Sequence, residues 1–130
     1  ILLFFGGIMM NYEMIFKALG EYTRIKIIKL LAYKAMYVCE LESVLNMSQP
    51  RISQHLKILK HANLVRDEKE GQRSVYSLNK ELIHDVFFQF TSFLDMPLES
   101  LSDFEQEYER IQRLNNDPEV ICCKTSGNKR

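Results

Sequence analysis

Polar side chains that could read DNA bases gather between Ser48 and Lys57. The segment SQPRISQHLKIL places Ile52, Leu56 and Leu59 at helical spacing, so we expect that stripe to be buried. The remaining side chains then lie on or near exposed faces, where glutamine can pair with adenine and arginine with guanine. The DNA-binding candidates on this helix are Ser48, Gln49, Arg51, Ser53, Gln54, His55 and Lys57. The alternative is that these residues form only the polar side of an amphipathic helix.

The position of each candidate along the helix indicates what it would contact. Side chains near the N-terminus of a reading helix reach deepest into the major groove, so they are expected to touch bases. The residues expected to do so are Gln49, Arg51, Ser53 and Gln54. Ser48 and His55 are candidates for phosphate binding, and Lys57 would add affinity that depends on salt.

Three cysteines form the second chemical feature, Cys39 ahead of the reading helix and the adjacent Cys122 and Cys123 near the C-terminus. Three thiols are the number that a trigonal site for a thiophilic ion needs. Either Cys39 joins the pair, or Cys122 and Cys123 bind with a smaller ligand set and Cys39 is a small core residue. The pair could also be incidental or redox-active.

Composition and charge exclude several classes of protein. The chain has 130 residues, 46% hydrophobic and 26% charged, which is typical of one folded domain and not of a disordered chain. Its formal net charge is zero, but the stretch from Ser48 to Arg73 is basic and the stretch from Asp95 to Glu119 is acidic, so only the middle should face a polyanion. No phosphate-cradling glycine loop or nucleophile elbow is present, so we expect neither an enzyme nor a catalytic cofactor.

The N-terminal ILLFFGGIMM is too short to span a bilayer and lacks the basic start of a signal peptide. Met9 and Met10 could be starts, so residues 1–8 are left out of the fold prediction. We expect a cytoplasmic protein, whose cysteines would be thiols or metal ligands.

Hydrophobic spacing predicts helices at 10–19 and 23–33, the second capped by Thr23, and then a short helix in YVCELESVLN. Ser48 should cap the reading helix, with Pro50 in its first turn. A β-hairpin follows, whose tip carries the DNA-binding candidates Lys69, Gln72 and Arg73. Asn79 should cap a helix at 80–94, whose spare apolar face suggests a subunit interface.

Beyond that helix, Ser102 and Glu105 should form a capping box for a helix at about 103–115, followed by a polar tail. The fold class is therefore mainly α with a β-hairpin wing (α+β), a winged helix-turn-helix. We expect a DNA-binding and dimerisation domain at 10–95 and a helix with a cysteine-containing tail at 96–130.

Three stretches resemble the ArsR/SmtB family of metal(loid)-responsive repressors, of the arsenical-resistance type. They are LGEYTRIKIIKLL, VCELESVLNMSQPRISQHLKILKHANLV and EGQRSVYSL, and the match covers about residues 13–94. The resemblance implies a homodimer that pairs through the N-terminal helix and helix 80–94. It also implies binding to an imperfectly palindromic operator in double-stranded DNA, with release when an inducer binds.

The sensing motif departs from the family pattern. Arsenic- and cadmium-sensing relatives often carry C-V-C-x-L-C before the reading helix, and this chain has Tyr37, Cys39 and Glu42 at those cysteine positions. Arsenite, As(III), takes three thiolates, so the familiar site is absent, and a relocated site would use Cys39, Cys122 and Cys123. A zinc site at Glu81, His84 and Asp85 lacks its second half. The remaining alternatives are regulation by thiol redox or another ligand, and a protein-interaction module without DNA binding.

Overall fold

The computed structural model of the protein describes residues 2–5 and 8–126. Contacts divide the chain into two compact units, residues 1–90 and residues 91–130. The division falls within the long helix α5, Lys80–Asp95, a few residues before the boundary expected from the sequence. Among the described residues, no helix is both long and apolar enough to cross a membrane.

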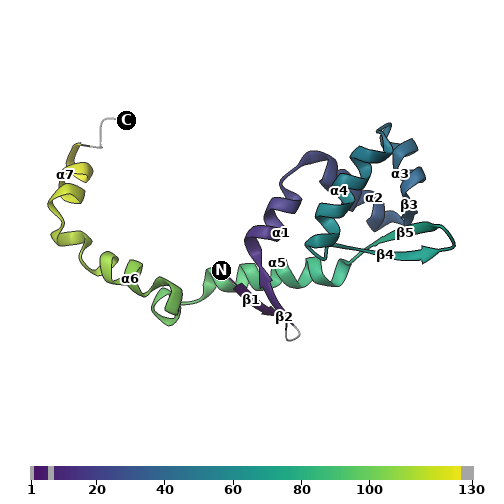
Figure 1. The fold of residues 1–130 in the computed structure, drawn as a ribbon. Helices are drawn as coiled ribbons and strands as arrows, with labels where there is room; N and C mark the ends of the chain where they lie inside the picture. Colours follow the sequence, from purple (N-terminus) through teal and green to yellow (C-terminus); the bar gives the residue numbers. More distant parts are fainter. Residues whose placement is uncertain (1, 6–7, 127–130) are drawn as a thin grey trace. The chain divides into compact units, whose positions relative to one another are not determined.

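The first unit has the predicted winged helix-turn-helix order, with short strands added (Figure 1). The helices are α1 Tyr12–Leu19, α2 Tyr22–Tyr33, α3 Val38–Leu45, α4 Gln49–His61 and the start of α5. The strands are β1 Leu2–Phe5, β2 Ile8–Asn11, β3 Met36–Tyr37, β4 Val65–Glu70 and β5 Arg73–Leu78. The short helix α3 and the following helix α4 make the helix-turn-helix pair, and β4 and β5 make the wing.

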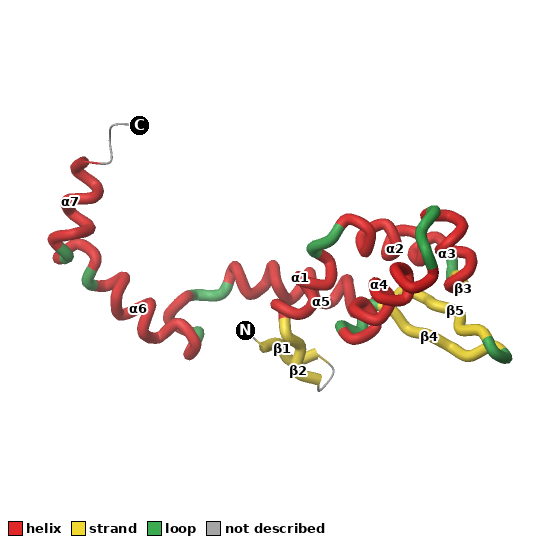
Figure 2. The backbone as a smooth tube through the Cα atoms, turned by 45° about the horizontal axis from the view of Figure 1, so that its top comes forward, coloured by secondary structure: helices red, strands yellow, loops and turns green. Residues whose placement is uncertain are grey.

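The wing is part of a three-stranded antiparallel sheet in the order β3-β5-β4 (Figure 2). Val65 pairs with Leu78 at its base and Glu70 with Arg73 at its tip. Gly71 has a φ of 65°, a left-handed conformation that glycine adopts at low cost, so it suits the tight turn between the strands. The sequence prediction missed β3, which pairs Met36 with Tyr76 and Tyr37 with Val75.

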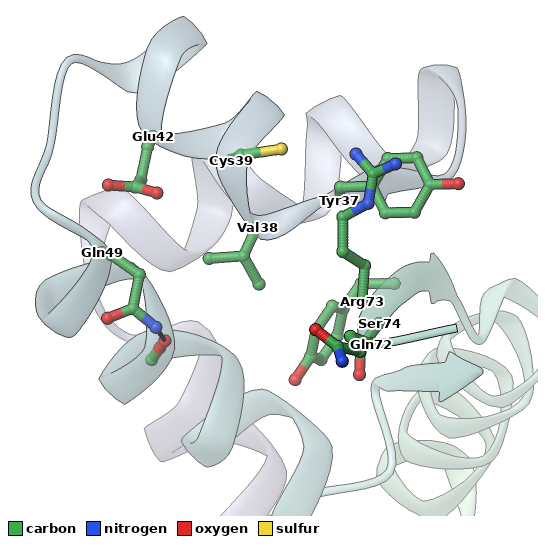
Figure 3. Close-up of a pocket in the computed structure, with 10 residues that line it drawn as sticks. Tyr37, Val38, Cys39, Glu42, Gln49, Gln72, Arg73 and Ser74 are labelled. Atoms are coloured by element: carbon green, nitrogen blue, oxygen red, sulfur yellow. Dashed lines mark hydrogen bonds between the residues drawn. The ribbon is translucent and has the colours of Figure 1, made fainter. Parts of the chain in front are cut away.

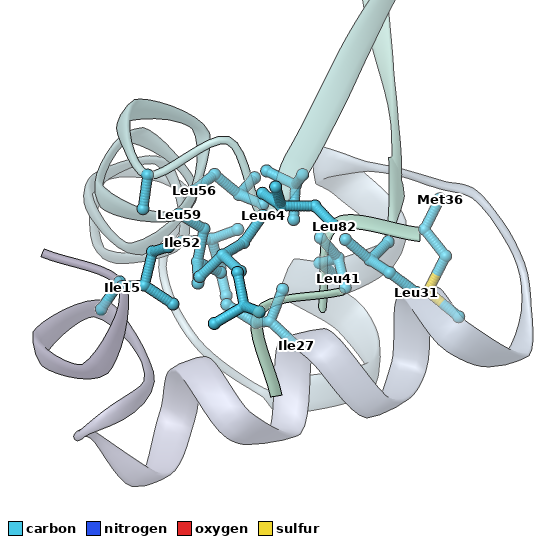
Figure 4. Packing of buried hydrophobic residues seen from close by; sticks show 14 of the residues in the cluster. Ile15, Ile27, Leu31, Met36, Leu41, Ile52, Leu56, Leu59, Leu64 and Leu82 are labelled. Atoms are coloured by element: carbon cyan, nitrogen blue, oxygen red, sulfur yellow. The ribbon is translucent and has the colours of Figure 1, made fainter. Parts of the chain in front are cut away.

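The core of this unit lies where α2, α3, α4 and the wing base meet (Figure 4). The predicted stripe of α4 is buried, since Ile52, Leu56 and Leu59 are at most 1% exposed. Ile27 from α2 and Leu41 from α3 are fully buried in the same cluster. Burial of these aliphatic side chains fixes one face of α4 inward, so the opposite face must point to solvent.

Helix caps were predicted with mixed success. Ser48 is the N-cap of α4, and the Asn79 side chain accepts from the backbone N–H of Leu82 at 3.4 Å, so both positions are confirmed. The Thr23 cap was wrong. The N-cap of α2 is Glu21, whose carboxylate accepts from the Arg24 backbone N–H at 3.0 Å. A carboxylate suits this place because it faces the positive end of the helix dipole.

The second unit is helical throughout most of its described length. Short 3-10 turns at Leu98–Ser100 and Ser102–Phe104 precede α6, Glu105–Gln112, and Leu114–Asn116 precedes α7, Pro118–Ser126. The capping box was wrong, because the N-cap of α6 is Phe104 and the helix is shorter than expected. The polar tail was also wrong as far as residue 126. Asp117 accepts from the Glu119 backbone N–H at 3.0 Å and Pro118 occupies the first turn, which together begin α7.

Candidate nucleic-acid interface

The turn between α3 and α4 sets the direction of the reading helix. Asn46 ends α3 in the left-handed conformation, with a φ of 53°, which an asparagine tolerates better than most residues. The Met47 backbone N–H donates to the Glu42 carbonyl at 3.2 Å and closes the turn. Two residues later α4 begins, and its inner stripe packs on α2 and α3. The polar face of α4 is therefore held by a fixed core.

The outer side of α4 carries most of the residues predicted to read DNA. Gln49, Arg51, Gln54 and Lys57 are exposed, and Ser53 is half-buried. The Gln49 amide Nε2 donates to Ser53 Oγ at 2.8 Å, so these two side chains are already ordered one helical turn apart. Ordered side chains lose less conformational freedom when they meet a base.

His55 differs from the other candidates because its side chain faces α2. It is only 17% exposed, and its Nδ1 lies 3.4 Å from Arg24 Nη1 and 3.9 Å from a Glu21 carboxylate oxygen. Arg24 in turn donates from Nε to the Ala18 carbonyl at 2.6 Å, which satisfies an acceptor at the end of α1. His55 therefore joins α4 to the α1–α2 junction, and its predicted phosphate contact stays a prediction.

Glu21 completes this junction. The backbone N–H of Arg24 is the main reason that the pKa of the Glu21 carboxyl lies below its usual value. Burial opposes this effect in part, and the nearby His55 and Arg24 side chains add smaller lowering effects. A negative charge at this cap stabilises α2 and faces the His55 ring.

Two hollows flank α4, and most of the predicted residues line one or the other. One, of about 470 Å³, is lined by Gln54 and Lys57 together with residues of α1 and α2. The other, of about 380 Å³, lies between α3, the start of α4 and the wing (Figure 3). Gln49, Ser53, Gln72 and Arg73 all line it, so the fold brings the reading helix and the wing tip to one concave surface. Ser48, Arg51, His55 and Lys69 line neither hollow.

The wing tip has a partner that the sequence prediction missed. The guanidinium of Arg73 lies over the ring of Tyr37, 4.9 Å from its centroid, and the Tyr37 hydroxyl donates to the Glu70 carboxylate. That hydrogen bond raises the pKa of the Tyr37 phenol, with smaller contributions from burial and from the Glu70 charge. At the wing base, Lys60 Nζ lies 2.9 Å from Asp67 Oδ1 and joins the end of α4 to β4. No sequence pattern pointed to Tyr37, because its partners follow it by more than thirty residues.

All three cysteines are exposed free thiols. The interpretation of Cys39 as a small core residue was therefore wrong; it lies on α3 beside Tyr37 and lines the same hollow (Figure 3). Cys122 and Cys123 lie on α7. Within the part of the chain that the structure describes, no three His, Cys, Asp or Glu side chains are grouped so that they could hold a metal ion. Cys39 belongs to the first unit of the chain, and Cys122 and Cys123 belong to the second.

Comparison with known proteins decides the family. Residues 22–67 match the model described as bacterial regulatory protein, arsR family. The transcriptional repressor SdpR of Bacillus subtilis is 37% identical over 81 residues, which cover 62% of this chain and 90% of that protein. The chain belongs to the ArsR family. It is a transcriptional regulator of that family, as its sequence motifs predicted.

Two further relatives place this ArsR-family member by sequence and by fold. The arsenic resistance transcriptional regulator ArsR2 of Pseudomonas putida is 32% identical over 116 residues, covering 84% of this chain and 95% of that one. The homodimeric winged helix-turn-helix DNA-binding domain Mb0332 of Mycobacterium bovis has a TM-score of 0.53 at 28% identity. That likeness covers 64% of this chain and 77% of the other, and it confirms the predicted winged helix-turn-helix.

Proposed function

We propose that this ArsR-family regulator is a homodimeric repressor that binds double-stranded operator DNA through α4 and the wing. The observation that carries the proposal is the polar outer side of α4, held outward by the fully buried stripe on its inner side. Side chains of this kind on a supported helix are what the major groove of DNA accepts. The basic wing tip beside them supports a second contact, to the DNA backbone.

The residues divide into two roles. Arg51 and Gln54 read base edges, with Gln49 and Ser53 beside them in the groove. Lys57, Lys69 and Arg73 bind phosphate, so they set the salt dependence of affinity. Ser48, His55 and Gln72 complete the set, His55 by holding α4 against α2 in addition to any phosphate contact.

The dimer forms through α1 and α5. In α5, Phe87 remains 46% exposed and Phe88 71% exposed, although Phe16 of α1 packs against Phe87 and Phe90. Large exposed aromatic surface on a helix is typical of a subunit interface. The homodimeric state of the M. bovis relative supports the same arrangement. Two reading helices on a two-fold axis would then match a palindromic operator.

The test is a selection of bound duplexes from a random double-stranded DNA library by the full chain, followed by affinity measurements at several salt concentrations. We expect enrichment of an imperfect palindrome whose half-sites lie about one helical turn, 10–10.5 base pairs, or a multiple of it apart. If the recovered duplexes shared no sequence, the protein would bind DNA non-specifically and the proposed operator recognition would be wrong. Failure to retain any DNA would support the interaction-module alternative.

We further propose that a thiophilic ion, As(III) or a similar one, releases the repressor from DNA, with Cys122 and Cys123 as ligands and Cys39 as the third. The exposure of all three thiols supports access by such an ion. The arsenic resistance named for the P. putida relative favours the same class of inducer.

Operator release should be titrated with arsenite, antimonite, cadmium and zinc, using the parent and the C39S, C122S and C123S variants. We expect the parent to respond to a thiophilic ion and both C122S and C123S to lose most of that response. If C39S also loses the response, Cys39 is the third ligand. If all variants respond like the parent, the cysteines do not sense. If only oxidants release the parent, the thiol-redox alternative holds.

A further inference from the structure

Tyr37 belongs at once to the start of α3 and to the sheet that carries the wing. It is the N-cap of α3, and its backbone N–H donates to the Glu40 carboxylate at 3.0 Å. It is also the second residue of β3, where it pairs with Val75 of β5. These contacts use only the backbone of Tyr37, so they leave its side chain available for another role.

The side chain is directed to the wing tip. Its hydroxyl binds Glu70 at the end of β4, and its ring lies under the guanidinium of Arg73 at the start of β5 (Figure 3). Glu70 and Arg73 face each other across the tip of the hairpin. One aromatic residue thus contacts both strands where the wing turns.

Stacking on a ring restricts Arg73 without using its hydrogen-bond donors. A guanidinium placed over an aromatic face is attracted by the ring and keeps its N–H groups free at its edge. Arg73 is otherwise an exposed arginine on a hairpin tip, whose many rotamers would have to be lost on binding DNA. The Tyr37 hydroxyl donates to Glu70, the residue opposite Arg73 on the hairpin, and the ring itself is what lies against the guanidinium.

We propose that Tyr37 is a positioning residue for DNA binding, which holds the Arg73 guanidinium ready to donate to a phosphate of the DNA backbone. The inference rests on the proposed function, because it requires that Arg73 contact DNA. Tyr37 itself touches no DNA. It also joins α3 to the wing tip, since its backbone begins α3 and its side chain contacts the tip.

A double-mutant cycle tests the coupling, with the selected operator as probe and affinity measured by fluorescence anisotropy. We expect Y37L to weaken binding about threefold to tenfold, the cost of ordering one free arginine. R73Q should weaken binding and lower the slope of log affinity against log salt by about 0.9. In the R73Q background, Y37L should then have no further effect. In the K69Q background, the matched wing control, Y37L should keep its full effect.

Two further variants distinguish loss of the Tyr37–Arg73 stacking contact from a general effect on folding. Y37F keeps the ring and should bind within about twofold of the parent, because the stack is what orders Arg73. R73K changes only an exposed wing residue and keeps its charge, but it loses the planar group, so it should weaken binding about as much as Y37L. If Y37L does not fold, R73K therefore tests the stacking contact in its place.

Equal weakening by Y37L with and without Arg73 would overturn the inference, since Tyr37 would then support only the fold. Parent-like binding by R73K would overturn it too. Either result leaves the proposed function standing as long as the parent binds its operator. A parent that binds no duplex would remove the proposed function, and this inference with it.

Discussion

His55 illustrates how a single residue of α4 can serve the interface without reading DNA. Its ring nitrogen Nδ1 lies near both the Arg24 guanidinium and the Glu21 carboxylate, which belong to the start of α2. The motif around His55 predicted a DNA contact because the residue lies within the polar run of α4. Its position on the side of α4 that faces α2 gives it a supporting role that spacing alone did not indicate.

The Glu21 carboxylate should make stability depend on pH in the acid range. Its pKa in the folded protein lies below the ordinary value of 4.5, chiefly because the Arg24 backbone N–H donates to it. Its contribution is therefore fully present above 4.5 and is lost as the pH falls through the lower, folded value. We expect the parent to unfold at a higher temperature than E21Q near neutral pH. This difference should disappear as the pH falls below 4.5.

The matched control for this measurement is E13Q. Glu13 lies in the first turn of α1 and forms an exposed ion pair with Lys17 one helical turn away, at 3.3 Å. Exposed pairs of this kind contribute little. If E13Q and E21Q gave the same curve at every pH, the assignment of the acid dependence to the α2 cap would be wrong.

At the scale of the elements, the buried stripe of α4 should carry much of the stability of the first unit. Leu56 is 1% exposed and Ile58, on the same helix, is 42% exposed. We expect L56A to lower the free energy of unfolding by about 2–5 kcal/mol, because it removes buried methyl groups and leaves a cavity. I58A should change it by about 0.5 kcal/mol or less. Urea unfolding at one fixed protein concentration measures both, and equal effects would contradict the packing described for α4.

The sequence predicted those elements that have a strong hydrophobic period. The helices α2, α4 and α5 and the wing were found near their observed bounds. Apolar residues at helical spacing marked α4 and α5, and the turn residues around Gly71 marked the wing. The strand β3 was missed, since two residues carry no period and the strand exists only by pairing with β5. Helix α7 was missed because its polar composition outweighed the Asp117–Pro118 start signal.

The candidate interface was predictable in part for the same reason. The exposed positions of Gln54 and Lys57 follow directly from the buried stripe of α4. The contact of Tyr37 with the wing depends on tertiary structure, because the two partners in that hydrogen bond are 33 residues apart. Sequence spacing predicts which face of a helix is free, but it does not predict which distant side chain will lie against it.

At the scale of the whole molecule, the dimer is the first requirement of the proposed function. We expect F88E to shift the protein from dimer to monomer in analytical ultracentrifugation, because it places a charge on the exposed aromatic surface of α5. K80E, on the first turn of the same helix, is the matched control and should remain dimeric. A dimer that F88E leaves intact would mean that subunits pair through another surface.

Operator affinity of an R51A/Q54A variant tests the central claim most directly. These two residues lie exposed on the outer side of α4, and each bidentate base contact is worth about 1–3 kcal/mol. Compared with the parent at one fixed salt concentration, the variant should bind the selected operator at least about 30-fold more weakly. R110A/Q112A, which removes the same two residue types from the exposed face of α6, should bind within about twofold of the parent. Parent-like operator binding by R51A/Q54A would contradict α4 as the reading helix.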